Sequence, residues 1–262
     1  MSLKINIVLK AFVIAGSLLL VIGGCVSSSK EREEKAVLHL DLGNSHLQAG
    51  RYPLALTSLL AAEKLDSRNF RVHHSLGLVY FARDRHDLAE KHFKTALKLS
   101  PKSTSTRNEL ANLLINRKRF KEAEALLKES EADLTYPEPG RTYYLLGALY
   151  FEMNRYSEAI DQLEKSIKFA KNDCFVLNYY GRSLFSLEKY KEAARVLDQA
   201  VGLCQQNSFD EPHYFSALTY YRLGDVEKSR ARFEELTRFY PDGKYLEKAR
   251  SMISILNKVK SE

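Results

Sequence analysis

The sequence predicts an all-α protein built from repeated helix pairs, and three observations support this prediction. Residues 70–103 have the apolar spacing of two amphipathic helices joined by a short turn. This 34-residue unit can be laid along the chain six times. Every copy keeps small residues at two positions and a large apolar residue at a third. A constant period of this length is typical of helical repeats, which are stabilised by contacts between neighbours.

The six copies cover most of the chain, at residues 36–69, 70–103, 104–137, 140–173, 174–207 and 210–243. Two-residue insertions precede the fourth and sixth copies. Apolar residues continue at helical spacing after the last copy, so residues 244–262 are expected to form a helix that caps the array. We therefore expect a solenoid of six helix hairpins and a capping helix, with residues 36–243 as one domain.

Close helix packing explains the residues that recur at fixed positions. Position 8 holds Gly43, Gly77, Ala111, Gly147, Gly181 and Ala217. Position 20 holds Ala55, Ala89, Ala123, Ala159, Ala193 and Ser229, and position 24 holds Leu59, Phe93, Leu127, Leu163, Leu197 and Phe233. Two helices approach closely only where a side chain is small, and a large residue then fills the adjoining groove.

This pattern resembles the tetratricopeptide repeat. In the second copy the resemblance rests on Leu76, Gly77 and Tyr80 in the first helix, and on Ala89 and Phe93 in the second. It extends over residues 36–243, and the third copy departs from it most. The resemblance implies stacked helical hairpins whose first helices face an inner, concave groove.

The first residues of the chain have the features of an export signal. Lys4 and Lys10 form a positive segment before an apolar run, residues 11–22, that is too short to span a bilayer comfortably. The following Gly23-Gly24-Cys25 resembles a bacterial lipobox. We expect residues 1–24 to be a signal peptide that is removed, Cys25 to carry the lipid, palmitate included, and residues 25–35 to be a flexible tether. The alternative is an ordinary signal peptide or membrane anchor with an incidental cysteine.

The lipobox resemblance also implies a location. Val26 follows the cysteine, and the Asp that marks inner-membrane retention in enteric-type lipoproteins is absent there. We therefore expect a lipid-anchored protein on the periplasmic face of the outer membrane. The formal net charge is +7, but basic residues alternate with acidic ones and form no patch, so a nucleic-acid partner is not expected.

The sequence contains no motif for catalysis, a cofactor or a metal. We therefore predict that the protein is not an enzyme and binds no cofactor or metal ion. His73 and His74 are adjacent and point apart on a helix, and His46 and His86 are interpreted as packing residues. Cys174 and Cys204 lie near the two ends of one hairpin. They could form a disulfide in an oxidising compartment, or remain two unconnected buried cysteines.

The remaining candidate site is the inner groove. By the tetratricopeptide resemblance, positions 2, 5, 9 and 12 of each first helix face it. Side chains suited to a peptide stand there: Asn44, His74, Phe81, Asn108, Asn112, Arg141, Tyr144, Phe151, Phe175, Asn178, Arg182, Phe185, Tyr214 and Tyr221. Aromatic rings offer apolar pockets and Asn amides can pair with a peptide backbone, although several rings could instead pack between repeats.

The lipobox, the repeat number and the Tyr136-Pro137-Glu138 junction together resemble the type IV pilus biogenesis lipoproteins, the pilotins. That resemblance implies a non-catalytic adaptor, with a monomer favoured, that binds an outer-membrane secretin and promotes its assembly. Two alternatives remain open at this point. One is a lipoprotein of outer-membrane β-barrel assembly, and the other is a scaffold for peptidoglycan enzymes.

Overall fold

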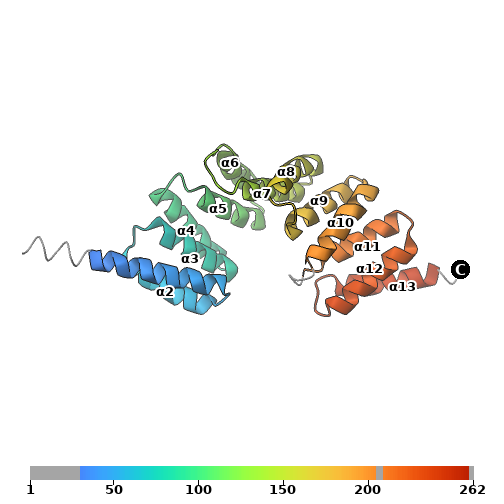
Figure 1. Cartoon of the computed structure of the whole chain (residues 1–262), viewed down its shortest axis with the longest axis horizontal. Coiled ribbons are helices and arrows are strands. Elements are labelled where there is room, and N and C mark those ends of the chain that lie inside the picture. Colours follow the sequence, from blue (N-terminus) through green and yellow to red (C-terminus); the bar gives the residue numbers. More distant parts are fainter. Residues whose placement is uncertain (1–29, 205–208, 260–262) are drawn as a thin grey trace, which may run out of the picture. The chain divides into compact units, whose positions relative to one another are not determined.

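The structure, a computed structural model, describes residues 30–204 and 209–259 (Figure 1). Within these ranges all regular secondary structure is helical. Residues 30–48 form the first described helix. It is followed by α2 (Tyr52–Leu65), α3 (Phe70–Ala82), α4 (His86–Leu99), α5 (Thr104–Asn116), α6 (Phe120–Glu131), α7 (Pro139–Glu152), α8 (Tyr156–Phe169), α9 (Cys174–Ser186), α10 (Tyr190–Cys204), α11 (Glu211–Arg222), α12 (Val226–Phe239) and α13 (Leu246–Val259). The all-α prediction is confirmed.

Successive helices pair through short turns, and the turns repeat one backbone conformation. Position 15 of every predicted copy is left-handed, with φ between 56° and 79°. These residues are Gly50, Asp84, Lys118, Asn154, Glu188 and Gly224. In the second copy the turn is closed by bonds from the Asp84 amide to the Phe81 carbonyl and from the Arg85 amide to the Tyr80 carbonyl. A left-handed residue after a helix lets orphan carbonyls accept such bonds.

The small residue at position 8 lies against the large residue at position 24 of the same pair. A Cβ atom placed on Gly77 would lie 2.5 Å from the Phe93 ring. A Cβ atom on Gly147 would lie 2.5 Å from Leu163 Cγ. Glycine at this position therefore lowers the intrinsic stability of the first helix but allows the second helix of the pair to pack closely against it. This contact bears out the close approach predicted from the small residues.

The described residues form two compact units that divide between residues 113 and 114, and we describe them separately. The boundary falls within α5. In the first unit, α2 and α3 enclose a core around Leu59 and Leu76. In the second unit, one core lies around Leu184 and Leu197 of α9 and α10, and another lies around Phe233 of α12.

Helix α13 closes the second unit. Ala249 and Leu256 are fully buried and belong to the same core as Phe233 and Leu236 of α12. Polar residues on its other side, such as Glu247 and Lys248, are exposed. An apolar stripe facing the array and a polar outer face are the features required of a capping helix.

The structure changes one prediction at the N-terminal side. Residues 30–35, predicted to be part of a flexible tether, are helical and continue directly into the first helix. Ion pairs between Lys35 and Glu31 at 2.7 Å, and between Lys30 and Glu34 at 3.9 Å, have the i,i+4 spacing that stabilises helices. The predicted signal peptide and Cys25 lie outside the described residues. Among the helices that are described, none is long and apolar enough to cross a membrane.

Candidate functional site

Two adjoining hollows in the second unit form the candidate site. The first has a volume of about 400 Å³ and lies at the start of α7, the end of α8 and the start of α9. The second has a volume of about 500 Å³ and lies between α9, the start of α11 and the turn before α13. Tyr144 and Phe175 line both hollows. We call this combined surface the α7–α11 surface.

The first hollow is mainly apolar. Pro137, Pro139 and Phe169 contribute to its walls, and Arg141 and Asp173 contribute charges. Phe169 and Phe175 are 59% and 44% exposed, so both rings are accessible to a partner. A hollow with exposed rings and a few charges at its edge suits an apolar side chain of a partner.

The second hollow contains more acidic than basic groups. Its acidic lining residues are Glu152, Asp210, Glu211 and Asp242, and its basic ones are Arg182 and Lys244. Glu152 and Asp242 are exposed, whereas Asp210 and Glu211 are buried. The accessible carboxylates therefore favour a basic group on whatever occupies this hollow.

Arg182 is the centre of the aromatic packing between the hollows. Its guanidinium lies over three rings, at 4.4 Å from the Phe151 centroid, 4.8 Å from that of Phe215 and 5.4 Å from that of Tyr179. Tyr179 in turn packs edge-on against Tyr144 and Phe151. The cation is thus held by ring faces, each of which attracts positive charge.

Glu211 holds Arg182 in this position. Arg182 Nη1 donates to Glu211 Oε2 at 2.7 Å, and Asn178 Nδ2 donates to the same oxygen at 2.8 Å. The other oxygen, Oε1, accepts from the hydroxyl of Tyr245 at 2.5 Å. Glu211 and Arg182 are 9% and 14% exposed. This carboxylate therefore joins α9, α11 and the start of α13 in one buried network.

The tyrosines of the site stay protonated near neutral pH. Burial raises the pKa of Tyr179 to about 12, and it also raises the pKa of Tyr144. Burial, and then the hydrogen bond to Glu211, raise the pKa of Tyr245. Their hydroxyl groups are consequently hydrogen-bond donors and do not serve as bases.

Comparison with known proteins identifies the repeats. Three sequence profiles described as tetratricopeptide repeats match residues 40–104, 102–172 and 216–243. The chain is built of tetratricopeptide repeats. The resemblance found in the sequence is thereby confirmed at the level of the repeat.

Two pilus proteins are similar to this tetratricopeptide-repeat chain. It is 27% identical over 190 residues to the type IV pilus assembly protein PilF of Pseudomonas aeruginosa, a match covering 69% of this chain and 75% of PilF. A solved structure of P. aeruginosa PilF has a TM-score of 0.72 and 23% identity, and the match covers 84% of this chain and 99% of that one. The structure of PilW, a widely conserved type IV pilus biogenesis factor, has a TM-score of 0.74 and 18% identity, and the match covers 81% of this chain and 97% of PilW. These similarities support a protein-binding adaptor role.

In the second unit, the structure brings most of the predicted groove residues together. Arg141, Tyr144, Phe175 and Arg182 line the hollows, and Phe151 lies under Arg182. The prediction is wrong for Asn178, which is 0% exposed. It stands at position 5, where the first helix meets the next pair, and its amide is bonded to Glu211 instead of facing a ligand.

Three other predicted residues of this unit lie outside the hollows. Tyr214 stacks on Tyr245 with ring centroids 4.5 Å apart, and Phe185 packs edge-on against Phe215 at 5.9 Å. Both rings therefore pack between helices, the alternative left open by the sequence. Tyr221 is 41% exposed on α11 but lines neither hollow.

In the first unit, the predicted groove residues are mostly involved in packing. Thr106 Oγ1 and His74 Nδ1 are 3.0 Å apart, and burial lowers the pKa of His74. Phe81 packs against His86 with ring centroids 5.7 Å apart. Asn44 and Asn112 are half-buried. Asn108 is 0% exposed, so the expectation that it faces a groove is wrong.

Sequence reasoning missed several residues of the site, among them Tyr179, Glu211 and Tyr245. Tyr179 stands at position 6 and Glu211 at position 2 of their copies, and Tyr245 follows the last copy. Glu211 did stand at a position assigned to the groove, and that position was a usable signal. No periodic signal pointed to Tyr245, because it reaches the site through the turn before α13.

A disulfide lies beside the first hollow. Cys174 and Cys204 are joined, with their Cα atoms 5.2 Å apart, at the base of the hairpin formed by α9 and α10. Its neighbours Asp173 and Phe175 both line the hollow. The Asp173 carboxylate also caps α9 by accepting from the amides of Phe175 and Val176. The start of α9, and with it one wall of the hollow, is therefore fixed at two points.

Proposed function

We propose that this protein is a non-catalytic adaptor of type IV pilus assembly that binds a secretin and promotes its assembly. The observation that carries the proposal is the 27% identity over 190 residues to the type IV pilus assembly protein PilF. The repeat architecture supports the adaptor part, because helical repeats present extended surfaces to protein partners.

The binding site in this proposal is the α7–α11 surface. An extended segment of the partner would place an apolar side chain in the first hollow, against Phe169 and Phe175. A basic side chain of the same segment would enter the second hollow, near the exposed carboxylates of Glu152 and Asp242. Exposed rings supply most of the affinity in such a mode, and the charges select and orient the partner.

The proposal includes a lipid anchor at Cys25 in the outer membrane. It is supported by the lipobox-like sequence that ends at this cysteine and by the apolar run before it. An anchored adaptor would meet its partner in the plane of the membrane, where secretin subunits assemble.

Cross-linking and affinity purification from the native envelope test the function. The tagged full-length protein is expected to recover a secretin, and its deletion is expected to abolish secretin multimers. Recovery of β-barrel assembly subunits or of peptidoglycan enzymes, with secretin multimers intact, would contradict the proposal in favour of one of the alternatives.

A pair of matched variants tests the site. Phe175→Ala removes a ring shared by both hollows, whereas Phe239→Ala removes a ring that lines neither. The two rings are almost equally exposed, at 44% and 45%. Partner recovery should fall about tenfold or more with Phe175→Ala and remain unchanged with Phe239→Ala. Equal recovery with both variants would show that the α7–α11 surface is not the binding site.

A further inference from the structure

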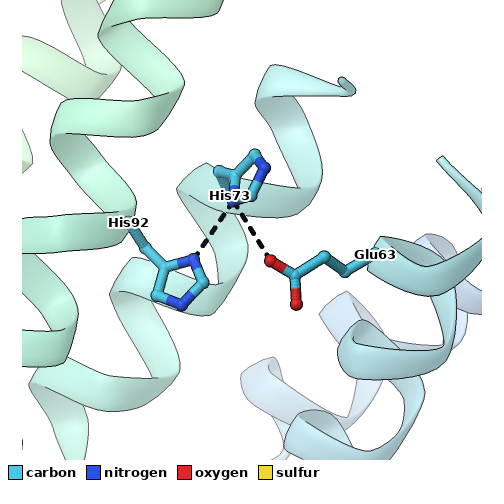
Figure 2. Close-up of side chains that lie close together, drawn as sticks. All are labelled: Glu63, His73 and His92. Carbon is cyan, nitrogen blue, oxygen red and sulfur yellow. Dashed lines mark hydrogen bonds and ion pairs between the residues drawn. The ribbon is translucent and has the colours of Figure 1, made fainter. Parts of the chain in front are cut away.

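Three side chains with metal-ligating atoms converge in the first unit. Glu63 lies near the end of α2, His73 in the first turn of α3 and His92 in the middle of α4 (Figure 2). His73 Nδ1 is 3.1 Å from His92 Nδ1 and 3.6 Å from Glu63 Oε1. One ligating atom from each residue lies within 4.8 Å of those of the other two. Three successive helices thus bring together two imidazoles and one carboxylate.

The backbone fixes the orientation and tautomer of His73. Its Nε2 lies 3.0 Å from the carbonyl oxygen of Ser67, in the turn between α2 and α3. A carbonyl only accepts, so Nε2 carries the proton and donates it, and in the neutral ring Nδ1 has a free lone pair. Metal-ligating histidines are held in the same way, with the second nitrogen donating to a carbonyl or carboxylate.

That lone pair points toward other electron-rich atoms. Glu63 Oε1 is an acceptor, and only one proton of the neutral His92 ring can be shared with His73 Nδ1. The side chain of His73 is 7% exposed, so water gives it little compensation. A cation at this point would be attracted by all three groups, whereas a shared proton satisfies only two of them at a time.

The distances suit a small divalent ion. Bonds from zinc to histidine nitrogen and to carboxylate oxygen are about 2.0–2.2 Å, so tetrahedral ligands stand about 3.4 Å apart. The two distances from His73 Nδ1, 3.1 Å and 3.6 Å, lie on either side of this value. Glu63 and His92 must approach each other further, and the half-exposed Glu63 side chain is free to adjust by rotation about its own bonds.

We propose that Glu63, His73 and His92 form a binding site for a divalent transition-metal ion of the zinc class. Imidazole and carboxylate ligands suit Zn²⁺ and its neighbours, and three protein ligands leave a fourth position for water. The bound ion would join α2, α3 and α4, and so stabilise the first two helix pairs against each other.

Calorimetric titration with Zn²⁺ tests the site. The full-length protein, purified in detergent and freed of metal with a chelator, is expected to bind one ion per chain with saturation. Glu63→Gln and His92→Ala should each weaken binding about tenfold or more. His86→Ala is the matched control, because His86 is also on α4 but does not belong to the converging group, and its Nε2 lies 3.8 Å from the carboxylate of Asp84. This control should bind Zn²⁺ as tightly as the unchanged protein.

Two further measurements separate the outcomes. Bound Co²⁺ should show visible d–d bands without a thiolate charge-transfer band, because the ligands are nitrogen and oxygen; a thiolate band would assign the ion to a cysteine and overturn the proposal. Zn²⁺ should raise the melting temperature of the unchanged protein and of His86→Ala, but not that of Glu63→Gln, whose far-ultraviolet circular dichroism verifies its fold. Equal affinity in all variants, or no saturable binding, would also overturn the proposal.

Discussion

The carboxylate of Glu211 should be a major stabilising group of the second unit, and Glu211→Gln tests this. The substitution keeps the shape of the side chain but removes its charge. In the structure the two oxygens accept from Arg182, Asn178 and Tyr245, with distances of 2.5–2.8 Å. A glutamine can keep its oxygen toward Arg182 and Asn178, with its amide nitrogen toward the Tyr245 hydroxyl, which can also accept, so the main loss is the negative charge beside Arg182.

The expected cost follows from burial. Glu211 and Arg182 are 9% and 14% exposed, so the change leaves a cation almost removed from water without its counter-charge. Breaking a buried ion pair in this way costs about 3–5 kcal/mol. The three rings around Arg182 offset part of the loss, and we therefore expect about 3 kcal/mol. This is a large share of the roughly 5–15 kcal/mol that stabilises an ordinary domain.

Urea unfolding followed by circular dichroism measures this cost, and hydrogen exchange in α9 and α11 locates it. The control is Glu247→Gln, which removes the same charge from a pair with Arg250 at 2.7 Å. Those side chains are 79% and 60% exposed, so the control should cost less than about 1 kcal/mol. If both variants lose the same small amount of stability, the network around Glu211 does not have the energetic role assigned to it here.

Three other predictions concern different parts of the chain. Reduction of the bond between Cys174 and Cys204 should lower the free energy of unfolding by about 3–4 kcal/mol, measured by urea unfolding with and without reductant, and two free thiols in the unreduced, unfolded protein would contradict the bond. Burial between the rings of Phe239 and Tyr240 lowers the pKa of His213 to about 4, so the unfolded chain binds more protons between pH 6.5 and 4. The stabilisation by neutral His213 is present above pH 6.5 and is lost as the pH falls toward 4, which lowers the free energy of unfolding by about 3 kcal/mol. His213→Phe should flatten this part of the plot of unfolding free energy against pH, and an unchanged slope would contradict the assignment. Cys25→Ser should move the protein out of the membrane fraction while leaving its circular dichroism unchanged, and continued fractionation with the membrane would exclude the lipid anchor.

The repeat architecture was predictable because its causes are local and periodic. Gly77 and Phe93 recur in kind at the same positions of other copies, and each pair packs within about twenty residues of sequence. The predicted starts of the second, third and fifth copies, Phe70, Thr104 and Cys174, are also the first residues of α3, α5 and α9. A period of small and large residues is thus sufficient to place the helices.

The candidate site was predictable only in part, because its composition depends on contacts between copies. The side chain at position 5 shows the difference. Tyr144 lines both hollows, whereas Asn178, at the same position of the next copy, is buried against Glu211. The position is the same in both, but the neighbouring copy supplies a different partner, and no single-copy pattern contains that information.

The sequence by itself determined the helix pairs, their order and the residues that allow each pair to close, because these depend on spacing within one copy. Only the tertiary structure decided which polar groups meet. Arg182 and Glu211 come from different helix pairs that stack on one another, and Glu63 comes from the pair that precedes the one holding His73 and His92. Their convergence depends on the distance and the rotation between stacked helix pairs. The whole packed interface sets these two quantities, and they cannot be deduced from the period of the sequence.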